Sequence, residues 1–393
     1  MRLQNMYLHG VRPAPLRPAL AAVMLIAVVL LLSQCAQRME REGVAEYSSE
    51  RVDFRLVEVT APLTNPWAIS FLPDGRGLVT ERGGQLYILE DEELLEVDGV
   101  PRVSAVGQGG LLDVAVHPDF EDNGLVYFSY SIDGDRTGTA IGRGELRGTT
   151  LENFEQIFVQ NRLSTGGQHF GSRILFLDDR TLVATIGDRG DRDRAQATDD
   201  HAGSLVRLND DGSVPEDNPW VGVDGYAPEL YVTGSRNSQG LAMHPETGVL
   251  WQHEHGPRGG DELNIIEAGA NYGWPVVSHG TEYMTGEQIG EGTHAGGMTP
   301  PVAYWSPAIA PSGMAFYNGE AFPEWQSDLF IGSLVDSHLL RIELDEGVVV
   351  HEERLLDDII GRIRDVEVGP NDYLYVIADE GSAPVYRLEP VDE

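Results

Sequence analysis

Hydrophobic and polar residues alternate in short runs from about residue 55 onward. Six segments share one pattern: a short apolar strand, a turn rich in Pro, Asp, Asn or Gly, and a second aromatic or β-branched strand. Equivalent apolar positions in the six first strands are Ile69, Val114, Ile174, Leu241, Met314 and Val366. They are separated by 45, 60, 67, 73 and 52 residues, which is too long for hairpins alone. Each step therefore predicts a four-stranded unit with variable loops.

Six units of this kind predict an all-β fold, a six-bladed β-propeller with four-stranded antiparallel blades, over residues 53–393. One unit is too small to bury both of its faces, whereas radial stacking gives every blade two neighbours and leaves only short edges. A large two-sheet sandwich is the competing architecture. It would not require the same strand–turn–strand pattern six times.

The N-terminal segment has a different character. An unbroken apolar run over residues 19–32 follows three positive charges, at Arg2, Arg12 and Arg17. This order is typical of an export signal. As a helix the run would be about 21 Å long, short of the roughly 30 Å hydrocarbon core of a bilayer. Residues 1–35 are therefore expected to act in export, as a signal peptide or as a lipoprotein or membrane-anchor segment.

The sequence around Cys35 is similar to a bacterial lipoprotein box, although Gln34 stands where a small residue is usual. Three alternatives stay open: lipidation of Cys35, a plain signal peptide, and an uncleaved anchor. Residues 36–52 then predict a polar tether. The expected location is the periplasm or the cell surface, with the N-terminus as a candidate membrane tether.

Composition excludes several function classes. The chain contains no Lys and a single Cys, so the Lys-dependent P-loop and pyridoxal enzymes, thiolate-ligated metals and internal disulfides are ruled out. The chain has 63 acidic and 27 basic residues and a net charge of −36. Such a charge repels a phosphate backbone, so nucleic acid is not an expected partner.

Four regions are dense in polar groups and glycine where a blade needs only a turn: residues 166–173 with 185–196, 233–240, 253–264 and 361–365. In a propeller such junctions converge on the central channel, where ligands bind. The sequence therefore predicts one shared site.

Several side chains in these regions could carry chemistry. His169 could take a hydroxyl proton, or it could be structural. Arg236 and Asn237 place a permanent charge beside an amide, which suits a carbonyl or carboxylate, or an ion pair between blades. Arg362 and Arg364 would project to the same side of a strand and favour an anionic ligand or neighbouring acidic residues.

The metal-binding candidates differ in quality. The His-Glu-His triplet at residues 253–255 resembles a zinc motif, but a strand would turn its Glu away from both His, so zinc is disfavoured. Gly256 and Pro257, followed by an acidic segment that includes Glu262, offer the oxygen ligands that calcium prefers. The spacing of a calcium-binding loop also occurs further upstream, at Asp188, Asp191 and Asp193. The Gly and Glu that such a loop requires at later positions are missing, so a solvated acidic loop is the better explanation.

Several phrases occur together in a specific order: GQGGLLDVAVHPDF, QHFGSRILF, TIGDRG, GSRNSQGLA, HGPRGGDELNIIEAGANYGWP, APSGMAFY and RIRDV. Over about residues 55–390 the chain resembles the soluble aldose sugar dehydrogenases that use pyrroloquinoline quinone (PQQ), the glucose/sorbosone dehydrogenase family of six-bladed propellers. The resemblance implies oxidation of an aldose at C1 to an aldonolactone, with electrons passed to an external acceptor.

The resemblance also implies roles for individual residues. The catalytic base would be His169, supported by Asp188, with Arg236 near the reacting quinone carbonyl and Gln108 in contact with the substrate. The PQQ contacts would be Asn237, Arg362 and Arg364. The main-chain carbonyls that hold a catalytic calcium would be those of Gly256 and Pro257, and ligands of a second, structural calcium would be Glu262 and Tyr272.

The chain departs from the family pattern at three positions. Gln168 replaces the Asp that precedes the catalytic His in the glucose-specific branch and is a candidate substrate contact. Val335 replaces a Lys that contacts the quinone, and Ala308 replaces a Thr. Two alternative functions remain from the residues alone: a calcium-dependent propeller lactonase or related hydrolase, and a non-catalytic extracytoplasmic binding propeller. The sequence does not indicate the oligomeric state.

Overall fold

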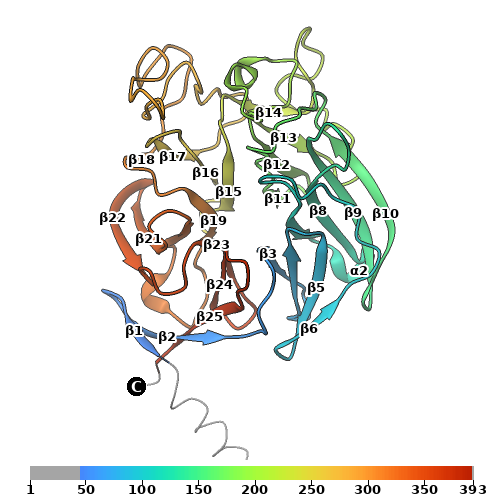
Figure 1. The fold of residues 1–393 in the computed structure, drawn as a ribbon, viewed down its shortest axis with the longest axis vertical. Coiled ribbons are helices and arrows are strands. Elements are labelled where there is room, and N and C mark those ends of the chain that lie inside the picture. Colours follow the sequence, from blue (N-terminus) through green and yellow to red (C-terminus); the bar gives the residue numbers. More distant parts are fainter. Residues whose placement is uncertain (1–44, 392–393) are drawn as a thin grey trace, which may run out of the picture. The chain divides into compact units, whose positions relative to one another are not determined.

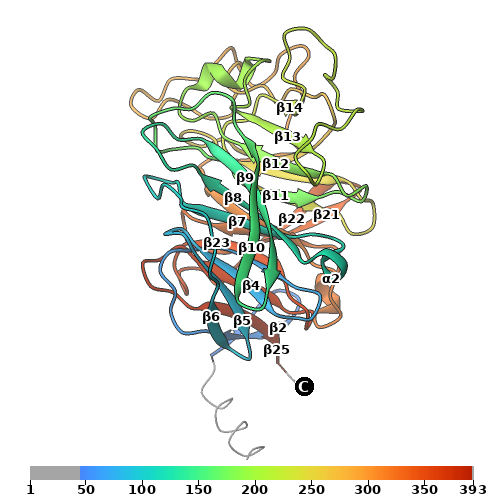
Figure 2. The same ribbon diagram turned by 90° about the vertical axis from the view of Figure 1, so that its right-hand side faces the viewer.

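The computed structural model describes residues 45–391, and they form six antiparallel sheets arranged around a centre (Figure 1). The first blade contains β3 (Pro66–Phe71), β4 (Gly77–Glu81), β5 (Gln85–Glu90) and β6 (Glu93–Glu96). The second contains β7 (Leu111–Val116), β8 (Leu125–Ser131), β9 (Thr139–Arg147) and β10 (Thr150–Val159). Figure 2 views the molecule from the side of this second blade.

The next three blades repeat the same order. The third contains β11 (Ile174–Phe176), β12 (Leu182–Ile186), β13 (Ser204–Leu208) and β14 (Leu230–Thr233). The fourth contains β15 (Ser238–Met243), β16 (Leu250–Glu254), β17 (Asp261–Ile265) and β18 (Ala303–Trp305). The fifth contains β19 (Pro311–Phe316), β20 (Leu329–Ser333), β21 (Leu339–Asp345) and β22 (Val348–Leu355). The helices of the described chain are short: α2 (Phe120–Asn123), η1 (Arg192–Gln196) and η2 (Pro323–Trp325).

The sixth sheet closes the ring with strands from both ends of the propeller. Its order is β23 (Ile363–Val368), β24 (Leu374–Ala378), β25 (Val385–Pro390), β2 (Asp53–Glu58) and β1 (Glu46–Ser48). Phe54 of β2 is opposite Pro390 of β25, and its buried ring packs against Trp325 of the fifth blade. Because β2 leads into the first blade and pairs with β25 of the last one, this sheet holds the ring closed.

The strand β1 begins before the predicted domain boundary at residue 53. The stretch 46–52 was assigned to the polar tether, yet its first three residues pair with β2, so this sheet has five strands rather than four. Residues 36–44 of the tether, the apolar run and Cys35 lie outside the described residues. Within residues 45–391, no helix has the length and apolar character needed to cross a bilayer.

The predicted six-bladed propeller is confirmed. The six apolar marker positions fall one in each inner strand, on β3, β7, β11, β15, β19 and β23, and each inner strand packs against the next around the centre. The second strands β4, β12, β16, β20 and β24 are buried along their whole length, because neighbouring blades cover both faces. The outer strand β22 alternates between buried and exposed positions, as expected for a strand with one solvent-facing side.

All six inner strands begin at the same end of the propeller. The segments that precede them contain Gln108, His169, Asn237, Ala310 and Arg362, each within a few residues of a strand start. Residues far apart in the sequence are therefore gathered at one end of the central channel.

Candidate functional site

A cavity of about 770 Å³ opens where the inner strands begin. His169 and Arg236 line it together with Gln108, the turn 255–259 and the segment 306–310. A second cavity of about 200 Å³ is lined by Asn237, Arg362 and Arg364, among others. The two cavities share three wall residues, Gln108, His255 and Ala310. The structure thus brings most of the predicted site residues together in adjoining spaces.

His169 is held by a chain of hydrogen bonds. Its Nδ1 lies 2.6 Å from Oδ1 of Asp188, and the indole Nε1 of Trp274 donates to Oδ2 of the same carboxylate at 2.9 Å. The main-chain N–H of Gly190 also donates to Oδ1, at 2.7 Å. An ionised carboxylate only accepts, so Nδ1 carries the proton and Nε2 is the basic nitrogen of the neutral ring.

The main chain at His169 adopts a conformation that non-glycine residues rarely adopt. Its φ is 54°, and its N–H donates to Oε1 of Gln108 at 2.7 Å. Gly187 leaves room for the main chain of His169, because a Cβ at position 187 would lie only 2.1 Å from the carbonyl oxygen of His169. Gly187 belongs to the TIGDRG phrase, so that glycine is needed for close approach to the histidine.

Burial and charge set the protonation of this pair. Burial lowers the pKa of His169, the hydrogen bond to Asp188 opposes this shift, and the nearby guanidinium of Arg236 adds to it. Burial alone would raise the pKa of Asp188, but the hydrogen bond from His169 and the adjacent positive charges hold it below its usual value. The stable state near neutral pH is therefore a neutral imidazole on an ionised carboxylate.

Arg236 is buried beside the histidine. One guanidinium nitrogen donates to the carbonyls of His255 and Gly256 at 3.0 and 2.7 Å, and the other lies 3.4 Å from the hydroxyl of Tyr283. Its guanidinium also lies 5.4 Å from the ring centroid of Trp274. A fixed positive charge therefore lines the same cavity as His169.

The predicted quinone contacts face the smaller cavity. Asn237 is buried and accepts a hydrogen bond from the N–H of Gly171 at 3.1 Å. Arg362 and Arg364 do project to the same side, but both pair with one carboxylate, at 3.0 and 2.7 Å from Oδ2 of Asp379. Asp379 therefore offsets one of the two positive charges on which the sequence prediction relied.

These residues fit an anionic planar ligand such as PQQ. The Nε of Arg364 is buried without a hydrogen-bond partner among the described residues, which suits a ligand oxygen at that point. Val335 and Ala308, the positions where the family pattern has Lys and Thr, both line the larger cavity. Position 335 therefore lines the cavity, but its side chain carries no charge.

The predicted calcium ligands form two groups, and the first is the turn at Gly256 and Pro257. The turn at Gly256 is fixed by Asp261, which accepts from the N–H groups of Gly256 and Ile309 at 2.8 Å each. The carbonyl of Gly256 accepts from Arg236, which leaves one of its lone pairs, and both Gly256 and Pro257 line the larger cavity. The turn can offer main-chain oxygens to a hard cation.

Glu262 and Tyr272 lie at a separate small cavity, next to Glu254. The two glutamates face each other across β16 and β17, and no Arg or His of the described chain forms an ion pair with either carboxylate. Burial raises the pKa of Glu254 to about 7. The Tyr272 hydroxyl donates to the carbonyl of Ile265 at 2.7 Å, so its ligand atom for a metal would be the main-chain oxygen. This buried acidic pair suits a calcium ion.

The His-Glu-His triplet lies at the end of β16 and just after it. In the 253–255 triplet, His253 is fully buried, and Nε2 of His255 lies 2.6 Å from the carbonyl of Pro311. Nowhere in residues 45–391 do three or more His, Cys, Asp or Glu side chains gather in a metal-binding arrangement.

One sequence-based interpretation needs correction. Asp188 does not lie in a solvated loop, since it is 1% exposed beneath His169, whereas Asp191 and Asp193 are exposed. Gln168 is exposed beside Gly190 and is not among the residues that line either cavity. The structure places Gln108, but not Gln168, on the cavity wall.

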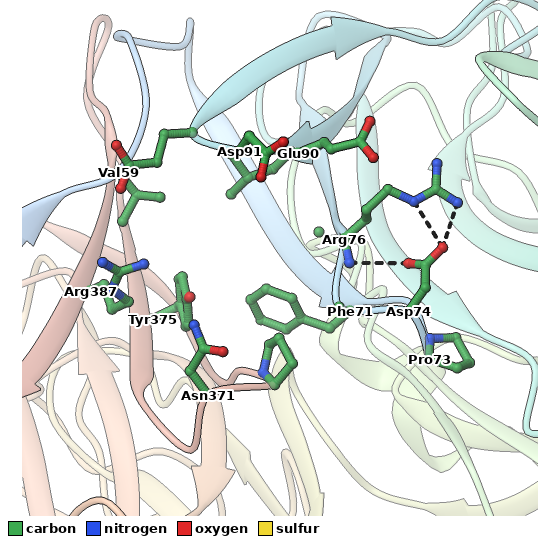
Figure 3. Close-up of a pocket in the computed structure, with 15 residues that line it drawn as sticks. Val59, Phe71, Pro73, Asp74, Arg76, Glu90, Asp91, Asn371, Tyr375 and Arg387 are labelled. Atoms are coloured by element: carbon green, nitrogen blue, oxygen red, sulfur yellow. Dashed lines mark hydrogen bonds and ion pairs between the residues drawn. The ribbon is translucent and has the colours of Figure 1, made fainter. Parts of the chain in front are cut away.

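A cavity of about 730 Å³ lies at the other end of the propeller, between the first and sixth blades (Figure 3). It is lined by Phe71 at the end of β3 and by Asn371 in the β23–β24 turn. In Figure 3, Arg76 forms an ion pair with Asp74 at its edge, at 2.7 Å. None of the predicted site residues lines this cavity.

Sequence reasoning missed four residues of the site. Trp274 belongs to the quoted GANYGWP phrase, which marked the segment but not its contact with Asp188. Asp379 and Tyr283 lie outside every phrase, and Glu254 was considered only as part of a zinc triplet. Their roles depend on strand register and loop packing, which the local sequence does not show.

Comparisons with known proteins agree with this architecture. The family model for Glucose / Sorbosone dehydrogenase matches residues 63–387. The chain belongs to this family. The prediction made from the motifs is thereby confirmed.

Three relatives are informative. The soluble aldose sugar dehydrogenase of Escherichia coli, solved in the apo form, superposes with a TM-score of 0.84 at 41% identity over 86% of this chain and 100% of that chain. The curated sequence of the aldose sugar dehydrogenase YliI of Escherichia coli is 43% identical over 84% of this chain and 91% of its own length. The PQQ-bound aldose sugar dehydrogenase of Streptomyces coelicolor superposes with a TM-score of 0.72 at 28% identity, over 88% and 99%.

Proposed function

We propose that this protein is a quinoprotein sugar dehydrogenase that uses PQQ and calcium to oxidise aldoses at C1. One observation carries the proposal: His169, held at Nδ1 by Asp188, lines a cavity that adjoins a second, arginine-lined cavity. Support comes from the PQQ-bound structure of a relative and from the aldose sugar dehydrogenases to which the chain is similar.

His169 would act as the general base. Its neutral Nε2 takes the proton of the anomeric hydroxyl as the hydrogen on C1 leaves with its electron pair. Asp188 stabilises the resulting imidazolium and keeps the ring in orientation. The proton then passes from Nε2 to solvent through the open mouth of the cavity.

Arg236 would stabilise negative charge that develops on an oxygen in the cavity, because its charge is already fixed by the carbonyls of His255 and Gly256. Gln108 would contact the sugar, since its oxygen holds the main chain of His169 while its side chain lines the cavity.

The cofactors would supply what the side chains cannot. Bound PQQ provides an acceptor for a hydride, that is, for two electrons, which no side chain of this protein offers. The Gly256 and Pro257 carbonyls would hold a calcium ion that acts as a Lewis acid, and Glu262, with the main-chain oxygen of Tyr272, a second one with a structural role. Asn237, Arg362 and Arg364 would bind the polar and carboxylate groups of the quinone.

The balance of the reaction is simple. The aldose loses the hydride of C1 and the proton of its anomeric hydroxyl, and an aldonolactone is formed. Two electrons leave the protein for an external acceptor. We further propose that this chemistry occurs outside the cytoplasm, in the periplasm or at the cell surface, because the N-terminal sequence resembles an export signal.

Reconstitution tests the proposal. Purified protein without cofactor is mixed with PQQ and calcium, and reduction of an artificial electron acceptor is followed across a panel of aldoses. We expect acceptor reduction that requires both PQQ and an aldose. Calcium-dependent hydrolysis of lactones without any PQQ-dependent reduction would instead support the lactonase alternative.

A further inference from the structure

Three arginines line the smaller cavity, but only two were expected from the sequence. Besides Arg362 and Arg364, the third is Arg82, in the turn after β4. It is half-buried and reaches the cavity from the first blade, whereas the other two come from the start of β23 in the sixth blade. The cavity therefore has positive groups on two of its walls.

The three charges are not equivalent. Asp379 pairs with Arg362 at 3.0 Å and with Arg364 at 2.7 Å, so these two arginines together contribute one net charge. Arg82 has no carboxylate partner among residues 45–391, and its described contact is a hydrogen bond from one guanidinium nitrogen to the carbonyl of Gly107 at 3.0 Å. Its positive charge is thus available to a ligand.

The local main chain holds Arg82 in place. The N–H of Leu111 donates to the carbonyl of Arg82 at 3.2 Å, and Gly110 lies directly against the arginine. A Cβ on Gly110 would come within 2.5 Å of Cγ of Arg82 and 2.1 Å of its carbonyl oxygen. Gly110 belongs to the GQGGLLD phrase that also supplies Gln108, so this phrase positions two wall residues of the site.

We infer that Arg82 is a further binding residue for a carboxylate of the quinone. This inference rests on the proposed function. Val335 lines the larger cavity and Arg82 the adjoining smaller one, so Arg82 adds a positive group from another blade to a site that has none at position 335. Arg82 acts on binding and does not take part in proton transfer.

The chain offers a matched control. Arg76 and Arg82 flank the same strand, β4, at opposite ends of the propeller, and Arg76 pairs with Asp74 beside the remote cavity (Figure 3). Substituting Gln at either position removes one positive charge from the same blade. A difference between the two variants therefore reports position and not net charge.

The experiment is a titration of cofactor-free protein with PQQ, followed by the absorbance of the quinone, for the wild type, Arg82→Gln, Arg82→Lys and Arg76→Gln. We expect Arg82→Gln to raise the dissociation constant at least tenfold, Arg82→Lys to restore part of the affinity, and Arg76→Gln to stay within about twofold of the wild type. Near-wild-type affinity in Arg82→Gln would overturn the inference. If the wild type itself binds no PQQ, the proposed function fails and this assignment fails with it.

Salt dependence separates a contact from a structural effect. A charge contact is screened by added salt, so the affinity of Arg82→Gln should fall less steeply with ionic strength than that of the wild type. If Arg82 merely supported the Gly107 turn, the variant would bind weakly but with the salt dependence of the wild type, and the inference would be overturned. Thermal unfolding of each variant, measured without PQQ, shows whether the fold is intact.

Discussion

At the scale of single residues, the site depends on an imidazole that is kept neutral. Burial lowers the pKa of His169, and Asp188 fixes the proton on Nδ1. In the proposed mechanism the base is therefore Nε2, which is available without prior loss of a proton. This arrangement makes the pH dependence of the reaction a direct report on one residue.

The first prediction concerns that pH dependence. Since the neutral form is the active one and its pKa lies below the ordinary value of about 6.5, kcat/KM should be constant at neutral pH and fall only as the pH drops below about 6.5. Asp188→Asn replaces the carboxylate whose hydrogen bond and charge raise the pKa of His169 with a neutral amide, so the acidic limb should move to still lower pH while kcat decreases. Profiles of kcat/KM against pH for both proteins test this. An acidic limb above pH 6.5 in the wild type would contradict the assignment.

The second prediction concerns the arginine pair. Charge-assisted hydrogen bonds contribute about 1.5–3 kcal/mol each, so Arg362→Gln with Arg364→Gln should raise the dissociation constant of PQQ at least about a hundredfold, which corresponds to about 2.7 kcal/mol. Val335→Lys should lower it, because position 335 faces the larger cavity. Both constants come from absorbance titration. Unchanged affinity in the double variant would mean that the quinone binds elsewhere.

Much of this site could be predicted from short phrases, because His169, Arg236, Asn237 and Gly256 each stand in a polar, glycine-rich segment before or after a strand. Asp379 could not, since it is one of two adjacent acidic residues after an apolar strand and nothing local distinguishes it. Only the register of β23 against β24 brings it to both arginines. Contacts between neighbouring strands of one blade are not encoded in local spacing.

At the scale of elements, the hairpin of β16 and β17 carries most of the candidate metal chemistry. Its tip is the turn that presents the Gly256 and Pro257 carbonyls, and its body contains the buried pair Glu254 and Glu262. Two buried carboxylates without a positive partner destabilise a folded protein unless a cation neutralises them. A metal here would therefore support both the fold and the activity.

The third prediction follows from this hairpin. Chelation should lower both the thermal midpoint and the activity, and calcium should restore them whereas zinc should not, because the available ligands are oxygens. Glu262→Gln should reduce the shift of the midpoint caused by calcium. The test is thermal unfolding with chelator, calcium or zinc. Identical midpoints and activities in chelator and in calcium would exclude a role for the metal.

At the scale of the whole molecule, one side chain links most of the blades. Arg173, just before β11 of the third blade, pairs with Asp365 of the sixth blade at 2.8 Å and with Asp113 of the second at 3.3 Å. It also donates to the carbonyl of Gln239 in the fourth blade and lies over Trp67 of the first. This buried network occupies the central channel beneath the site and connects five of the six blades.

The fourth prediction tests this link. Arg173→Met keeps much of the side-chain volume but leaves Asp113 and Asp365 buried without their positive partner, which typically costs about 3–5 kcal/mol. The thermal midpoint should fall by at least about 5 °C. Arg180→Met is the control, since Arg180 lies in the hairpin of the same blade and forms an exposed pair with Asp119. Equal effects of the two substitutions would contradict a central role for Arg173.

The blade count could be predicted from the sequence because every inner strand and the hairpin after it repeat one pattern. Ring closure could not, since β2 pairs with β25 from the far end of the chain, and neither strand carries a signal for the other. The short strand β1 was assigned to a tether for the same reason: its three residues, Glu46–Ser48, become a strand only beside β2. Pairing between segments that are far apart in the sequence depends on the assembled ring.

The most direct test of the whole account is a single turnover without any electron acceptor. PQQ-loaded protein is mixed with an excess of an aldose that the reconstitution assay identifies as a substrate, and the absorbance of the bound quinone is followed over time. We predict complete reduction of one quinone per active site in the wild type. In His169→Ala, with PQQ still bound, the rate should be lower by roughly 10²–10⁴-fold. A quinone that stays oxidised in the wild type, or one that is reduced equally fast in His169→Ala, would contradict the account.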